Sequence, residues 1–102
     1  MRYLVYFEVS TDVGNRLDFE EEGPGKIIGY VVNRFKPEVM YTEAGTRNVF
    51  MVADLDETQM TELMLIVSKK LGTQLEFTPV IPGAATVEIA AKAIENVKKA
   101  PI

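Results

Sequence analysis

The sequence contains no cysteine and no histidine. Without cysteine the chain has no disulfide, no thiolate nucleophile and no thiolate metal ligand, and without histidine it has no imidazole base and no haem-ligating imidazole. These absences exclude Ser-His-Asp and Cys-His catalysis, the common zinc enzymes and His-ligated haem chemistry. We therefore expect neither a metal nor a cofactor.

A basic surface and a long apolar run are also lacking. The formal net charge is −4, and the lysines and arginines are scattered along the chain, so the sequence has no charge pattern suited to a phosphate backbone. No apolar run approaches the length of a membrane span, and Met1-Arg2-Tyr3 leads directly into a strand pattern without a signal-peptide core. We expect no nucleic-acid partner, no membrane partner and a cytoplasmic location.

The length of 102 residues and the hydrophobic content of 47% suit one core. The chain is therefore predicted to be a single domain over residues 1–102. A domain of this size leaves much of its surface in water, and a spare apolar face is better covered by a second copy than left exposed. A homodimer or a higher homo-oligomer is expected.

The first third of the chain predicts a strand, a long connection and a helix. Residues Arg2 to Val9 are aromatic and aliphatic on both faces, which is typical of a central strand. The polar stretch from Ser10 to Gly25 predicts a connection with at most a short helical piece. Apolar residues at helical spacing predict a helix over Lys26–Lys36, ended by Pro37, and a strand over Ile27–Asn33 is the competing interpretation.

The remainder predicts a hairpin, a helix, an edge strand and a final helix. In chain order these are strands at Glu38–Glu43 and Arg47–Asp54 around the loop Ala44–Thr46, a helix from the cap Asp56 to Leu71 with Gly72 beyond it, a strand at Thr73–Val80, and a helix at Ala84–Ala100. The final helix is rich in alanine and amphipathic. Its apolar stripe consists of Val87, Ala90, Ala91, Ile94 and Val97.

This order of elements predicts an α+β fold of ferredoxin-like type, β-α-β-β-α-β, with an added C-terminal helix. Both central helices would cover one face of a four-stranded antiparallel sheet. The aromatic and aliphatic residues of the first and third strands that point away from the helices would then meet the same face of a second protomer across a two-fold axis.

The chain resembles the dimeric α+β barrel superfamily over nearly its whole length. The resemblance is carried by three stretches, Tyr3–Val9, the hairpin Tyr41–Val52, and the helix Asp54–Leu71 followed at once by Thr73–Phe77. The superfamily includes muconolactone-isomerase-like proteins, small cofactor-free monooxygenases and short families without an assigned activity, and the chain looks most like the short families. It departs from the haem-degrading branches by lacking histidine and from the monooxygenases by lacking tryptophan. The resemblance implies a dimeric barrel.

Acylphosphatases share the expected strand order and use an arginine after the first strand with a later asparagine. Arg16 and Asn48 match those residue types. However, Ser10–Arg16 does not reproduce the glycine-rich phosphate loop of that family, and an anion cradle needs converging backbone N–H groups. The sequence therefore disfavours this resemblance.

A ligand pocket is expected between the helix layer and the sheet, or at the barrel mouth. Tyr6 and Glu8 share one face of the first strand, and Tyr41 and Glu43 share one face of the second. In a functional interpretation, Glu8 or Glu43 is a general base of raised pKa and Tyr6 or Tyr41 donates a hydrogen bond to an oxyanion. The simpler interpretation, which we favour, has both glutamates in water and both tyrosines packed at the core edge.

Arg47 and Asn48 follow the hairpin loop and are candidates for gripping a ligand carboxylate. The favoured alternative pairs Arg47 with Glu43 across the hairpin. The acidic run Asp18–Glu22 lacks the spacing and the glycine of a calcium loop, so a solvated loop is the better interpretation.

Two functions fit these observations. The first is binding, with or without transformation, of a small organic ligand in a dimeric α+β barrel. The second is a non-catalytic regulatory or interaction module that acts through its dimer interface. The sequence does not decide whether the protein is an enzyme, and an enclosed pocket would favour the first function.

Overall fold

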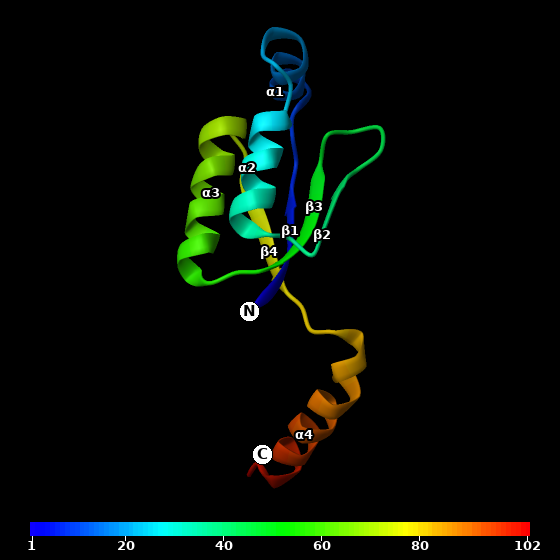
Figure 1. The fold of residues 1–102 in the computed structure, drawn as a ribbon. Coiled ribbons are helices and arrows are strands. Elements are labelled where there is room, and N and C mark those ends of the chain that lie inside the picture. Colours follow the sequence, from blue (N-terminus) through cyan, green and yellow to red (C-terminus); the bar gives the residue numbers. More distant parts are fainter.

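A four-stranded antiparallel sheet forms the centre of the molecule, and the computed structural model describes the whole chain from residue 1 to residue 102 (Figure 1). The strands are β1 (Arg2–Phe7), β2 (Val39–Thr42), β3 (Val49–Asp54) and β4 (Leu75–Pro79). Their order across the sheet is β2-β3-β1-β4, and each neighbouring pair is antiparallel. The expected α+β class with an antiparallel four-stranded sheet is confirmed.

Helical segments connect and follow the strands. They are α1 (Thr11–Asn15), the π-helical turn η1 (Arg16–Glu20), α2 (Gly25–Phe35), α3 (Glu57–Leu71), the 3-10 turn η2 (Gly83–Ala85) and α4 (Thr86–Lys99). The helix predicted over Lys26–Lys36 is present as α2, so the competing strand interpretation is wrong. None of these helices has the combination of length and apolar character that crossing a membrane requires.

The connection between β1 and α2 is more helical than the sequence predicts. The Ser10 side chain caps α1 by accepting a hydrogen bond from the backbone N–H of Val13 at 3.2 Å, and α1 runs directly into η1. Val13 and Leu17, four residues apart, face the core, and Leu17 is buried. The expectation of a connection with at most a short helical piece is therefore wrong in its extent.

Helices α2 and α3 cover one face of the sheet (Figure 1). Because side chains alternate along a strand, every second residue of β1 and β3 points toward the helices. Val5, Met51 and Ala53 on this face have no exposed surface, and Leu63 of α3 packs into the same cluster. The core contains no buried polar or charged residue, so hydrophobic burial holds the two layers together.

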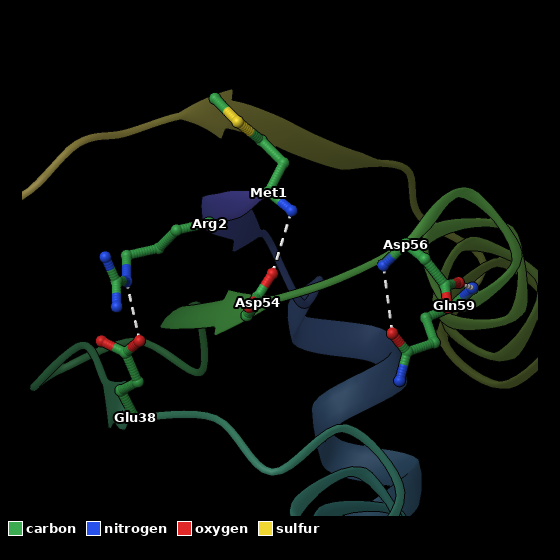
Figure 2. Close-up of polar contacts among 6 residues, drawn as sticks. All are labelled: Met1, Arg2, Glu38, Asp54, Asp56 and Gln59. Atoms are coloured by element: carbon green, nitrogen blue, oxygen red, sulfur yellow. Dashed lines mark hydrogen bonds and ion pairs between the residues drawn. The ribbon is translucent and has the colours of Figure 1, made fainter.

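Two ion pairs stabilise the end of the sheet at which the N-terminus lies (Figure 2). The Met1 ammonium contacts the Asp54 carboxylate at 2.9 Å, and Arg2 Nε contacts Glu38 Oε1 at 2.7 Å. The ammonium hydrogen bond and charge lower the pKa of Asp54 below its usual value.

The capping residues of α3 lie at the same end of the sheet (Figure 2). Asp56 and Gln59 form a reciprocal capping box: each side chain accepts a hydrogen bond from the other residue's backbone N–H. The helix closes at Gly72, whose φ of 65° suits glycine. The predicted helix after Asp56 is therefore confirmed at both ends.

Helix α4 projects away from the rest of the molecule (Figure 1). It contains no buried residue, and the longest dimension of the chain reaches 60 Å. The predicted apolar stripe is present but has no partner in the chain, since Val87 is 80% exposed and Val97 is 63% exposed. An exposed stripe of this kind is unusual for a monomeric protein.

Candidate functional site

The face of the sheet opposite α2 and α3 is uncovered. It is apolar along the middle of β1, β2 and β3 and polar on β4, where Glu76 and Thr78 lie beside Tyr6 and Leu4. We call it the open face, and its apolar members are Leu4, Tyr6, Val39, Tyr41, Phe50 and Val52. Tyr41, Phe50 and Tyr6 lie in one row across β2, β3 and β1, and the rings of Tyr6 and Phe50 are 4.7 Å apart. Tyr6 and Phe50 therefore lie outside the space between sheet and helices, whereas Phe7 lies inside it.

A polar cluster borders the open face where the β2-β3 hairpin loop lies. The Tyr6 hydroxyl donates to Glu8 Oε1 at 3.3 Å and accepts a hydrogen bond from Asn48 Nδ2 at 3.2 Å. The Asn48 Oδ1 accepts from the backbone N–H of Val9 at 3.0 Å. Three of the residues proposed from the sequence, Tyr6, Glu8 and Asn48, are thus brought together.

Glu43 and Tyr41 lie on the same face but outside that hydrogen-bonded group. The Thr46 hydroxyl donates to Glu43 Oε1 at 3.1 Å, so this carboxylate binds within its own hairpin loop. Tyr41 is 67% exposed, and no side-chain hydrogen bond involves its hydroxyl. The arrangement places both glutamates at the border of an open surface and outside the cavity between the helices and the sheet.

The pKa of Tyr6 is raised. Partial burial among its neighbours contributes most, and the carboxylates of Glu8 and Glu43 add to the effect, while the hydrogen bond from Asn48 opposes it. The phenol therefore keeps its proton well above neutral pH. It acts as a hydrogen-bond donor at this surface and not as a base.

Arg47 lies on the other side of the sheet from Asn48. Its Nε donates to Asp18 Oδ2 at 3.0 Å, and its Nη2 donates to Asn15 Oδ1 at 2.9 Å. The expected pairing of Arg47 with Glu43 is wrong, because Glu43 follows the open-face alternation of β2 and Arg47 follows the helix-side alternation of β3. Arg47 instead joins the hairpin to the α1-η1 segment.

Gly14 makes this position of Arg47 possible. The residue is buried in α1, and a β-carbon placed on it would overlap the Cδ of Arg47. Only a glycine lets the helix backbone approach the guanidinium so closely. Sequence reasoning missed this pair, because Gly14 has the pattern of a loop glycine and its partner lies more than thirty residues away.

A cavity of about 120 Å³ lies between the helices and the sheet. Fourteen residues line it, ten of them hydrophobic, and they include Phe7, Val31, Val49 and Leu71. Arg47 and Asp18 supply the charged groups of the lining. The cavity has the location that the sequence predicts for a pocket, with an apolar wall and a guanidinium among its few polar groups.

A polar groove of about 480 Å³ adjoins the cavity at the hairpin end of the molecule. Glu8, Thr11, Thr46 and Asn48 are among its polar lining residues, and Arg47 lines both the groove and the cavity. Arg47 is therefore placed between the apolar cavity and the polar groove. This position suits a ligand with an apolar body and one anionic end.

Other features of the surface are less specific. A wider groove of about 570 Å³ beside α2 and α3 is open and carries charges of both signs, from Glu21, Glu22, Lys26 and Lys70. No group of three or more His, Cys, Asp or Glu side chains is close enough to hold a metal ion. Comparison with models of protein families, with curated proteins and with solved structures gave no match for this chain.

Proposed function

We propose that this protein binds a small organic carboxylate, with the apolar part of the ligand in the cavity beneath α2 and the carboxylate on Arg47. The observation that carries the proposal is a mostly apolar cavity lined by a guanidinium. Its volume of about 120 Å³ is close to that of an apolar protein cavity of roughly 150 Å³ that holds benzene. The ligand class is therefore a single aromatic ring or a short branched acyl chain.

Arg47 can accept such a ligand at low cost. Only its Nε and one N–H of Nη2 are engaged in hydrogen bonds, so Arg47, which also lines the polar groove, keeps further N–H groups that can donate to a ligand. Its ion pair with Asp18 is about one third exposed on both sides, and pairs of this kind contribute about 0–1 kcal/mol. A ligand carboxylate can therefore replace Asp18 as the partner of Arg47, or bind Arg47 together with Asp18, with little loss of stability of the fold.

The arrangement favours binding over catalysis. Tyr6 and Asn48 point to the open face, while the cavity lies on the helix side of the sheet. A ligand in the cavity is thus separated from the Tyr6 hydroxyl by the sheet itself. Ligand binding without turnover joins the two functions expected from the sequence, since a bound molecule can regulate what the module contacts.

We further propose that the fold is ferredoxin-like and that two copies associate so that each copy covers the open face of the other. The strand order β2-β3-β1-β4 and the placement of α2 and α3 on one side support the first statement. The apolar row Tyr41-Phe50-Tyr6, in which Tyr41 is exposed and the other two rings are half-buried, supports the second. A second copy of the same chain can cover this row, so no different partner protein is needed.

The ligand proposal is tested by thermal unfolding with benzoate and isovalerate. At ten times the dissociation constant a ligand adds about 1.4 kcal/mol, which corresponds to a rise in Tm of roughly 5–10 °C for a domain of this size. Benzyl alcohol, which has the ring without the charge, should give a smaller rise. The variant Arg47→Gln should lose the difference between benzoate and benzyl alcohol.

The matched control is Arg34→Gln, because Arg34 also holds a carboxylate, that of Glu62, but lies outside the cavity. This variant should respond to benzoate as the parent chain does. A second variant, Val31→Leu, adds a methylene to the cavity wall and should weaken binding while the fold is kept. An equal benzoate response in the parent chain and in Arg47→Gln would disprove the proposal.

A further inference from the structure

Two apolar surfaces of this chain have no partner. One is the open face of the sheet, and the other is the stripe of α4, in which the Ile94 side chain is 54% exposed. Each surface exposes apolar area to water, and neither is covered by any other part of the chain. When two copies associate, the apolar stripe of one copy can cover the open face of the other.

We propose that α4 of one copy lies across the open face of a second copy, whose own α4 lies across the first. This inference rests on the proposed homodimer and names the element that makes the contact. It differs from a direct stacking of two sheets, because a helix and not a second sheet covers each open face. The exchange is reciprocal, so the assembly is closed and two-fold symmetric.

The length of α4 matches the sheet. The helix has 14 residues and is therefore about 21 Å long, and the strands β1 and β3 have six residues each and are about 20 Å long. One α4 can thus cover the open face from one end to the other.

The direction of α4 favours contact with the open face of a second copy over contact with the open face of its own chain. The chain leaves the sheet beside Arg2, since the backbone N–H of Val80 donates to the Arg2 carbonyl at 3.0 Å, and α4 then points away from its own sheet (Figure 1). To reach its own open face the helix would have to reverse its direction within residues 80–83. A partner that abuts at the Arg2 end receives α4 without any reversal.

The charges agree with that direction. On a partner placed end to end, the C-terminal part of α4 reaches the border formed by Glu8 and Glu43. Lys98 lies three turns after Val87 and therefore on the same side of α4 as the apolar stripe. Neither these glutamates nor Lys98 has an ion-pair partner within its own chain.

The open face and α4 together approach the size of a specific interface. They supply six apolar residues of the open face, the three border residues Glu8, Glu43 and Asn48, the five residues of the α4 stripe and Lys98, which makes fifteen per copy, against at least about twenty in a specific interface of standard size. Either surface alone falls well short of that number. A stable dimer therefore needs both.

Cross-linking tests the exchange directly, because the chain has no cysteine of its own. We would prepare Ile94→Cys in α4 and Val52→Cys on the open face, mix the two, and treat them with a short bis-maleimide. The proposal predicts covalent dimers in the mixture, with at least about tenfold less in either variant alone. Lys92→Cys, on the opposite side of α4, is the matched control and should cross-link poorly to Val52→Cys.

Each other result contradicts the proposal in a recognisable way. Linked dimers of Val52→Cys alone would indicate direct sheet stacking, and linked dimers of Ile94→Cys alone would indicate pairing of two α4 helices. A double variant that links only within one chain would indicate folding back. A parent chain that sediments as a monomer at high concentration would overturn the dimer itself, whereas the first two results would overturn only the exchange.

A charge introduced in the stripe gives a second readout. Ile94→Asp would bury an unpaired carboxylate against the open face and should weaken dimerisation by roughly a hundredfold or more. Lys92→Asp changes the opposite side of the helix and should leave dimerisation nearly unchanged. Since α4 contributes no buried residue to the core, both variants should fold. Equal dimerisation in the two variants would contradict the proposal.

Discussion

Gly14 and Arg47 depend on each other at the scale of single residues. Gly14→Ala should push the flexible guanidinium out of its place and not unfold the protein, because the overlapping atoms belong to the Arg47 side chain. We expect a change in unfolding free energy of less than about 1 kcal/mol, since alanine is the better helix residue, together with loss of the specific response to benzoate. Thermal unfolding with and without benzoate measures both.

Gly29→Ala is the control for that substitution. Gly29 lies inside α2, and no atom is within 4 Å of the position that its β-carbon would take. This variant should gain up to about 1 kcal/mol from helix propensity and keep the benzoate response. If Gly14→Ala also kept the response, the guanidinium would not need its place beside α1.

Tyr6 provides a pH-dependent signal on the open face. Because its folded pKa is raised above the unfolded value, the stability that it contributes is fully present below the ordinary tyrosine pKa and is lost as pH rises through the folded value. Absorbance titration of phenolate should show one tyrosine ionising later than the others. Tyr6→Phe should remove that step, and Glu8→Gln should shift it to lower pH; a step unchanged by both would place the late tyrosine elsewhere.

At the scale of elements, α2 ends in a strained residue. Lys36 has φ of 47°, the left-handed conformation that glycine adopts without cost, and it is the only residue other than glycine with positive φ. Lys36→Gly should raise the unfolding free energy by about 0.5–1 kcal/mol, measured by urea denaturation. Lys36→Ala removes the same charge but keeps the β-carbon, so it should give no such gain.

Elements with a local signal were predictable from the sequence. The apolar spacing of Ile27, Val31 and Phe35 indicated α2, and Asp56 with Gln59 indicated the start of α3. In contrast, the helical part of residues 10–20 was underestimated, because Gly14 has the pattern of a turn residue. Its signal was the cap Ser10 with apolar residues at positions 13 and 17.

The candidate site was predictable only in part. Alternation along the strands placed Tyr6 with Glu8 and Tyr41 with Glu43. The partner of Arg47 was not predictable, because Asp18 reaches it through the packing of η1 on the sheet and no spacing in the sequence encodes that contact. The cavity follows from the same packing, so its approximate location was foreseeable and its lining was not.

At the scale of the whole molecule, the proposed exchange makes the linker between β4 and α4 sensitive to concentration. In a separated chain, residues 80–83 and α4 contact little else and should be cleaved readily by a non-specific protease. In the exchanged dimer both lie against a second copy. Limited proteolysis of this linker should therefore be fast in dilute protein and slow in concentrated protein.

The proline that closes β4 has a consequence for how far association can proceed. The N–H of Val80 points inward to Arg2, so the preceding nitrogen, that of Pro79, faces outward and carries no hydrogen. A foreign strand therefore finds no donor at this point of the sheet margin, and fibre growth by strand addition is impeded there. The molecule can recruit a twin through its broad surface while resisting open-ended polymerisation along this margin.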